Sequence, residues 1–197
     1  MSTAPQRRQA AILYAELRNF TRLSEALEPA KVLELANEFF AFAARCATNH
    51  TGKVVCLNND SLLAAFAAGS PKEFCAQALQ AAQELQREFP AAGERWQTEY
   101  GLPAAVAIGL HLGEAVFGIA ATQGIQQPLA FGDCVSIAER MVHRARAGEI
   151  VISLEVMKGL GAAVKTLGAE ELPPLELGKR PPIPIYGMVV ETRLDFT

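Results

Sequence analysis

Residues 53–66 read KVVCLNNDSLLAAF, and this stretch contains two short apolar runs, Lys53–Leu57 and Leu62–Phe66. Between the runs, residues 58–61 (NNDS) are all of types that favour tight turns. Apolar runs of this length bounded by turn residues are typical of β-strands. We therefore predict a β-hairpin with Asp60 at its tip.

A long amphipathic helix is predicted on each side of the hairpin. The first begins at Glu28-Pro29, because proline is well tolerated in the first turn of a helix, and Gly52 ends it. The second runs from about residue 73 to residue 89. In both helices apolar side chains recur at steps of three and four. The two apolar faces contain Val32, Ala36, Phe39, Ala43 and Cys46, and then Phe74, Ala78, Ala81, Leu85 and Phe89.

The remaining elements place this hairpin within a larger sheet. The run Ala10–Ala15 is short, apolar and unbroken, which suits a buried strand. The order strand, helix, hairpin, helix, strand is that of a ferredoxin-like βαββαβ sheet, so we expect an α+β fold with a C-terminal extension. Beyond the second helix we predict a connecting loop over 93–101, strands over 104–111 and 114–119 with Gly113 between them, a helix over 135–145, a strand over 149–152, a short helix over 154–160, and a last strand over 183–190.

Length and composition indicate one globular domain. The 197 residues are enough for one domain with a sizeable core, and half of them are hydrophobic, which argues against disorder. We expect the domain to span residues 9–197, after a polar segment at residues 1–8. A net charge of −3 gives no reason to expect a nucleic-acid partner. No apolar stretch is long enough to cross a bilayer and the start lacks a signal-peptide core, so we expect a soluble, cytoplasmic protein.

The four cysteines are expected to be reduced. None belongs to a C-x-x-C pair, and we identify no cysteine–histidine motif with the spacing of a metal site. Cys46 and Cys75 lie within the apolar faces of the two long helices, where a free cysteine usually acts as a small hydrophobic residue. We therefore predict structural thiols at these two positions.

Four motifs lie in order on the predicted elements. Residues 13–21 read LYAELRNFT, 59–66 read NDSLLAAF, 108–118 read IGLHLGEAVFG, and 131–140 read FGDCVSIAER. Together they resemble the catalytic domain of class III adenylate/guanylate cyclases, and the resemblance covers about residues 9–190. It implies the class III cyclase fold and a reaction that converts a nucleoside triphosphate into a 3′,5′-cyclic monophosphate and pyrophosphate.

The resemblance assigns metal and phosphate roles to four residues. In the family two aspartates hold two Mg²⁺ ions, and the matching positions here are Glu16 and Asp60. Glu16 keeps the charge but reaches about 1.5 Å further, a displacement that Mn²⁺ would tolerate better than Mg²⁺. The phosphates would lie against Phe20 and Thr21 at a helix start, with Asn19 where glycine is usual. Alternatively, Thr21 is an ordinary helix cap and Phe20 a core residue.

Residues for base recognition and transition-state stabilisation are largely substituted. The two base-reading positions carry Cys56 and Leu129, and neither side chain can replace the usual donors and acceptors. A register slip near Leu129 would instead bring residue 126 or 127, both glutamine, to that position. The family's Asn and Arg pair corresponds to Ser136 and Arg140, one helical turn apart. Arg140 would meet developing phosphate charge, or else would be a solvated arginine in a salt bridge.

Two histidines have simpler interpretations. His111 is expected to be a structural residue within a strand, and His143 an exposed helix residue one turn beyond Arg140.

Because the family's site forms between two subunits, we expect a homodimer. Three functions stay open: a catalytically degenerate cyclase-homology domain that binds nucleotide or regulates signalling, the metal-bearing half of a heterodimer with another cyclase domain, or a homodimeric cyclase with unusual base specificity.

Overall fold

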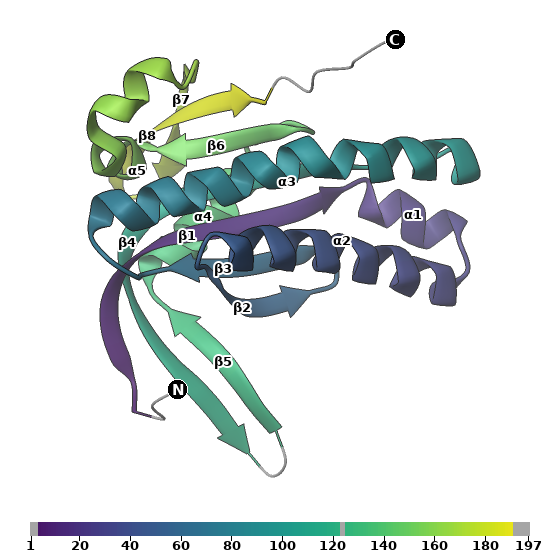
Figure 1. Cartoon of the computed structure of the whole chain (residues 1–197), viewed down its shortest axis with the longest axis horizontal. Coiled ribbons are helices and arrows are strands. Elements are labelled where there is room, and N and C mark those ends of the chain that lie inside the picture. The colour runs from purple at the N-terminus through teal and green to yellow at the C-terminus, as the bar shows by residue number, and fades with distance from the viewer. Residues whose placement is uncertain (1–3, 123–124, 191–197) are drawn as a thin grey trace.

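A computed structural model describes residues 4–122 and 125–190 of the chain, and it places two long helices along one face of a mixed sheet (Figure 1). The eight-stranded sheet has the order β2-β3-β1-β4-β6-β8-β7, and β5 pairs with β4 outside this path. The strands are β1 (Gln6–Arg18), β2 (Lys53–Asn58), β3 (Ser61–Phe66), β4 (Ala105–Thr122), β5 (Ile125–Phe131), β6 (Glu149–Ser153), β7 (Glu170–Leu177) and β8 (Arg180–Val189). The helices are α1 (Phe20–Ala26), α2 (Pro29–Asn49), α3 (Pro71–Tyr100), α4 (Asp133–Val142) and α5 (Leu154–Leu160), followed by a short 3₁₀ segment, Gly161–Thr166.

The predicted ferredoxin-like core is confirmed as β1-α2-β2-β3-α3-β4. The hairpin is antiparallel, and its two-residue turn consists of Asn59, which has a positive φ of 35°, and Asp60. Asparagine tolerates such a backbone better than most residues, so the local sequence is suited to this turn. The side chains predicted for the apolar face of α2 are all buried.

The two faces of β1 pack against different helices because successive side chains of a strand point to opposite sides. Leu13 and Leu17 belong to the main core under α2 and α3, whereas Ile12 and Tyr14 pack with residues of α4. Glu16 follows on the α4 side, so this acidic side chain lies opposite the large helical core.

Helix α3 is much longer than the sequence predicted. It continues through Pro90 to Tyr100, where a connecting loop was expected over 93–101. Trp96 is fully buried, and its ring meets that of Phe89 edge-on, with centroids 5.5 Å apart. Gly93 lets the helix approach β4, since a Cβ there would lie 2.4 Å from the carbonyl oxygen of Ala104. This burial outweighs the backbone hydrogen bond that proline cannot make.

The prediction of two strands separated at Gly113 is wrong. β4 runs without interruption, and Gly113 pairs with Ala10 of β1 in the middle of the sheet. A Cβ at residue 113 would lie 2.7 Å from the Cβ of Cys134, so glycine at this position allows α4 to approach the strand closely. Strand β5 was not predicted at all. With the end of β4 it forms a ribbon that extends away from the helical layer (Figure 1).

In the C-terminal extension β6 and α5 lie where they were predicted, whereas β8 begins at Arg180, three residues before the predicted strand over 183–190, and lies between β6 and β7. Strand β6 runs parallel to β4, and β8 and β7 add antiparallel strands beyond it. No helix of the described residues is long and apolar enough to span a membrane.

Candidate active site

Of the two carboxylates assigned to metal binding, Glu16 lies on β1 and Asp60 lies in the turn between β2 and β3. Glu16 is opposite Ser61 in the register of β1 and β3, and the amide of Leu17 donates to the carbonyl of Asp60 at 2.8 Å. The hydroxyl of Tyr14 lies 3.1 Å from that of Ser61 on the same face. Burial raises the pKa of Tyr14, and nearby negative charges, including those of Glu16 and Asp60, raise it further. Both carboxylates therefore lie near the half-buried phenol of Tyr14.

The carboxylate of Glu16 is already engaged by two basic side chains. Nη1 of Arg18 donates to Oε1 of Glu16, and Nε2 of His143 lies 3.4 Å from Oε2. The Glu16 side chain is only 15% exposed, so these partners replace much of its hydration. The position that resembles a metal ligand is thus the centre of an internal ion-pair cluster.

Arg18 also connects β1 to the end of α4. Its Nη2 donates to the carbonyls of Val142 and Ala145, the latter at 2.8 Å. The last carbonyls of a helix lack partners within the helix and carry partial negative charge, so a guanidinium is well suited to this place. Sequence reasoning missed this role. The available signal was that Arg18 and Glu16 are two residues apart and share a strand face.

Histidine 143 has a more specific position than the sequence predicted. Its side chain is 61% exposed, as expected, yet it lies at the Glu16 carboxylate. Glu139, also exposed and on α4, is close enough to contribute to the raised pKa of Tyr14. His143 and Glu139 therefore belong to the surroundings of the site, whereas His143 was expected to be only an exposed helix residue.

The turn after β1 opens α1 differently from the proposed threonine cap. Asn19 is the N-cap residue, with φ of 67°, and its side-chain amide donates to the carbonyl of Pro103 at 2.8 Å. Thr21 lies inside the first turn and is exposed, so it is not the cap. Phe20 is half-buried against the main core, as expected. The amide N–H groups of a first helical turn lack helical acceptors, which leaves them available to an anion.

The base-reading positions lie on β2 and β5. Cys56 is half-buried opposite Leu63, and its thiol donates weakly to the carbonyl of Leu57 at 3.6 Å. Leu129 pairs with Gly118 and lines a cavity of about 340 Å³ between β2 and the β4–β5 ribbon. Gln126 and Gln127, the alternatives to Leu129, are both exposed on β5.

The pair expected to stabilise the transition state lies on the outer face of α4. Ser136 and Arg140 are both exposed, while Ile137 and Met141 bury the opposite side of the helix. Among the described residues Arg140 forms no salt bridge, so the alternative of an internal ion pair has no support within one chain. Its guanidinium faces solvent.

His111 is buried, in agreement with the structural role expected for it. Its side chain is 6% exposed, and Nδ1 lies 3.7 Å from a carboxylate oxygen of Glu155 on α5. Burial lowers the pKa of His111, although the nearby charges of Glu155 and Asp133 oppose this effect. His111 is thus a buried polar residue of β4 beside Glu155 of α5.

Comparison with known proteins identifies the family. The adenylate and guanylate cyclase catalytic domain family matches residues 3–180. An adenylate cyclase of Anabaena cylindrica is 29% identical over 142 residues, which are 70% of this chain and 28% of that protein. Adenylate cyclase 1 of Rhizobium meliloti is 28% identical over 144 residues, or 70% of this chain and 21% of that one. The chain thus spans less than a third of these relatives.

Solved structures agree in fold. The adenylyl cyclase CyaB of P. aeruginosa superimposes with a TM-score of 0.85 at 22% identity, over 98% of this chain and 100% of that one. The guanylyl cyclase Cya2 gives a TM-score of 0.82 at 25% identity, over 96% of each chain. From the family match and this fold, the chain belongs to the adenylate and guanylate cyclase catalytic domain family, the class III cyclases.

Proposed function

We propose that this chain is a dimeric, nucleotide-binding cyclase-homology domain with a degenerate active site, which serves in signalling or regulation and not in rapid turnover. The observation that carries the proposal is the state of Glu16. At the position of a metal-binding aspartate, the chain has a longer carboxylate, which Arg18 and His143 both contact.

The residues around Glu16 fit a divalent cation only after local rearrangement. Glu16 and Asp60 supply hard oxygen donors, which suit Mg²⁺ or Mn²⁺. When bound, such ions lower the pKa of the ribose 3′-hydroxyl and neutralise phosphate charge. However, one oxygen of Glu16 accepts from Arg18 and the other lies beside His143. Binding an ion through Glu16 would compete with a guanidinium that also holds the end of α4.

Loss of base recognition supports the same proposal. The thiol of Cys56 and the aliphatic side chain of Leu129 lie at the positions that would read the base edge. Leucine offers no hydrogen bond, and a thiol is a weak donor. A nucleotide held mainly by its phosphates, with Arg140 as a candidate contact, would bind with little discrimination between bases.

The dimer is part of the proposal because Ser136 and Arg140 are exposed on α4, whereas the Glu16 carboxylate is largely buried. Ser136 and Arg140 point to solvent from α4, on the side of that helix away from its buried residues. The family's arrangement between two subunits would bring such a face to the carboxylates of a second copy.

A second candidate function is favoured by one observation. Glu16 and Asp60 both keep a carboxylate near the start of β3, while the base-reading and asparagine positions are substituted at Cys56, Leu129 and Ser136. A chain of this kind is suited to supply the metal carboxylates of a heterodimer whose other subunit supplies base recognition and an asparagine.

A nucleotide assay tests both candidates. The purified chain is incubated with ATP, GTP, CTP or UTP and with Mg²⁺ or Mn²⁺, and cyclic monophosphates are sought by mass spectrometry. We expect no product, together with measurable nucleotide binding and a dimeric mass by light scattering. A cyclic product that disappears in Asp60→Ala would contradict the degenerate-site proposal.

The heterodimer is tested by complementation. The chain is mixed with a class III cyclase domain that keeps its base-reading residues but has lost both metal carboxylates. Product from the mixture alone, lost again with Asp60→Ala, would support the second candidate. Asp133→Ala is the matched control, because Asp133 is an exposed aspartate that pairs with Arg180 outside the Glu16 cluster.

A further inference from the structure

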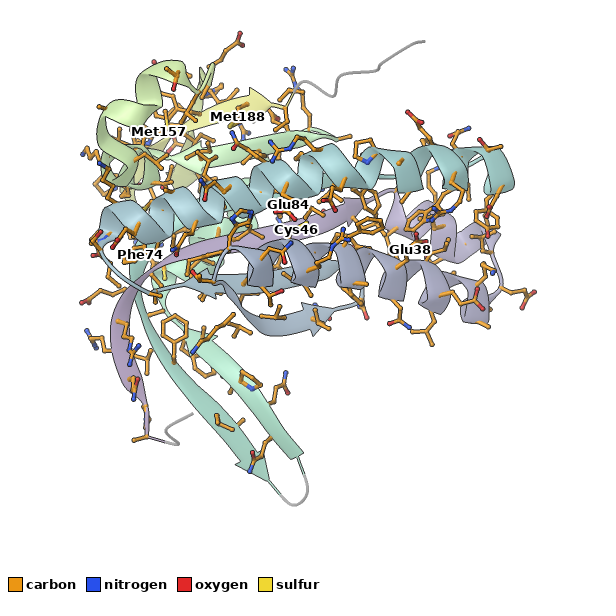
Figure 2. All side chains as sticks on the ribbon, in the orientation of Figure 1. Glu38, Cys46, Phe74, Glu84, Met157 and Met188 are labelled. Carbon is orange, nitrogen blue, oxygen red and sulfur yellow. The ribbon has the colours of Figure 1, made fainter. Side chains whose placement is uncertain are left out.

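We propose that a zinc ion binds between α2 and α3, held by Cys46, Glu84 and Glu88. One ligand atom from each of these residues lies within 4.8 Å of the ligand atoms of the other two. Figure 2 labels Cys46 on α2 and Glu84 on α3, at the line where the two helices pack. This cluster lies on the helical layer, on the opposite side of the sheet from α4 and Glu16.

The spacing of the residues suits two packed helices that share one ion. Glu84 and Glu88 are four residues apart on α3, so both carboxylates lie on one face of that helix. Cys46 faces them from the last turns of α2. His50 follows Cys46 by four residues and caps the helix, and Nε2 of His50 donates to Glu84 at 2.6 Å.

Cys46 distinguishes this cluster from an ordinary group of surface acids. Its side chain is 1% exposed within the main core, and its sulfur is directed towards two carboxylates. A structural thiol needs only apolar neighbours. Cys75, the second buried cysteine of the main core, belongs to the same apolar cluster. The two carboxylates already have donors in Asn49, His50 and Arg45, so a bound ion would replace part of these contacts and take the place of the thiol proton.

The donor set favours zinc over other divalent ions. Zinc binds cysteine sulfur, carboxylate oxygen and histidine nitrogen in a tetrahedral arrangement, whereas Mg²⁺ and Ca²⁺ prefer oxygen donors only. Tetrahedral bonds of about 2.0–2.3 Å place ligand atoms about 3.5 Å apart. Side-chain rotations that move the ligand atoms by about 1 Å would therefore complete the site. The three anionic ligands would be balanced by the ion together with Arg45, which already pairs with Glu88.

Neighbouring side chains hold Glu84 in place. Asn49 donates to one carboxylate oxygen at 2.8 Å, and His50 donates to the other. Hydrogen bonds of this kind orient a ligating carboxylate and increase metal affinity. The fourth position of the ion would be open to water, on the side where Glu88 is exposed. We infer a structural ion that joins α2 to α3, separate from the nucleotide site.

The proposal is tested by adding Zn²⁺ to chelator-treated protein and counting bound ions by native mass spectrometry and titration with a competing dye. All proteins carry Asp60→Ala, so that Asp60 contributes no ligand. We expect one bound Zn²⁺ per chain, and at least a tenfold weaker affinity in Cys46→Ser and in Glu84→Gln. Cys75→Ser is the matched control, because Cys75 is an equally buried thiol in the same core.

Two further readouts keep the result decisive. Co²⁺ bound through sulfur gives an intense thiolate charge-transfer absorption, which should appear in the Asp60→Ala protein and vanish in Cys46→Ser. Zn²⁺ should raise the Tm of this protein and leave that of Glu84→Gln unchanged, which separates lost binding from a folding defect at Cys46. Absence of a tightly bound ion, or zinc affinity that is equal in the Cys46 and Cys75 variants, would overturn the proposal.

Discussion

Removing the side chain of Arg18 is expected to destabilise the domain more than removing any exposed arginine. Arg18 and Glu16 are 22% and 15% exposed, and Arg18 also donates to two carbonyls at the end of α4. Breaking a fully buried ion pair costs about 3–5 kcal/mol, and partial exposure reduces this to about 2 kcal/mol. Losing the donor of the two carbonyls adds about 1 kcal/mol. Arg18→Ala should therefore lower the free energy of unfolding by about 3 kcal/mol.

Urea unfolding followed by far-ultraviolet circular dichroism measures this loss. With a slope of about 2 kcal/mol per molar urea, the midpoint should fall by about 1.5 M. Arg7→Ala is the matched control, because Arg7 pairs with Glu114 at 3.4 Å while both side chains are mostly exposed, at 72% and 66%. Such surface pairs contribute less than about 1 kcal/mol.

Two outcomes decide whether the reasoning about Arg18 holds. A midpoint for Arg18→Ala that shifts no further than that of Arg7→Ala would show that Arg18 does not hold α4 on the sheet. The midpoint of Arg18→Lys should lie between those of the two alanine variants, since lysine keeps the charge but lacks the forked donors that reach Glu16 and α4 together. Adding Glu16→Gln to Arg18→Ala should recover part of the loss, because the unpaired carboxylate is then gone.

Three further predictions concern packing and pH. Gly109→Ala should lower the free energy of unfolding, measured in urea, by about 2 kcal/mol, because the new Cβ would lie 2.4 Å from a carbonyl oxygen of α4. The control is Gly118→Ala, whose Cβ would meet nothing within 4 Å and which should change the free energy of unfolding by less than about 0.5 kcal/mol. Glu38→Ala should lower the free energy of unfolding by about 1–3 kcal/mol, because the buried indole N–H of Trp96 loses its acceptor at 3.1 Å. Glu38→Gln keeps an acceptor and should lower it less. Urea midpoints and near-ultraviolet dichroism of the tryptophan measure the effect, and equal losses in the two variants would contradict the prediction. Burial lowers the pKa of His111, so below about pH 6.5 the unfolded chain binds a proton at this residue that the folded chain does not. The free energy of unfolding should therefore be highest above that pH and should fall as the pH drops. In His111→Asn the free energy of unfolding should change less between about pH 7.5 and 5.5.

Elements with strong local signals were predicted well. Pro29 at the first turn of α2 and the NNDS turn before β3 determine where those elements begin, because capping and turn chemistry act within a few residues. The misjudged elements depended on distant partners. α3 continues past Pro90 because Trp96 is buried there, with its ring against Phe89 and its indole N–H donating to Glu38 of α2, and no local sequence pattern predicts these contacts.

The strand β4 and the ribbon with β5 illustrate the same difference. Gly113 is a turn residue by local preference, but the sheet keeps it extended because α4 approaches there. Strand β5 contains Pro128 and two glutamines, a weak strand pattern by itself, and it forms because it pairs along β4.

For the site, the family, the hairpin tip with Asp60 and the substitutions at Glu16, Cys56 and Leu129 could all be recognised from the amino-acid sequence. These follow from residue identity and short spacings, which need no knowledge of distant contacts. The contact of His143 with Glu16 joins residues far apart in the chain, so it depends on how α4 packs against β1.

The cluster of Cys46, Glu84 and Glu88 likewise depends on how α2 packs against α3. Contacts between two packed helices depend on which side chains are buried together. The number of residues between Cys46 and Glu84 does not follow a helical or strand period that would predict such a contact. The identity of each ligand was therefore visible in the sequence, whereas their meeting at one place was a consequence of packing alone.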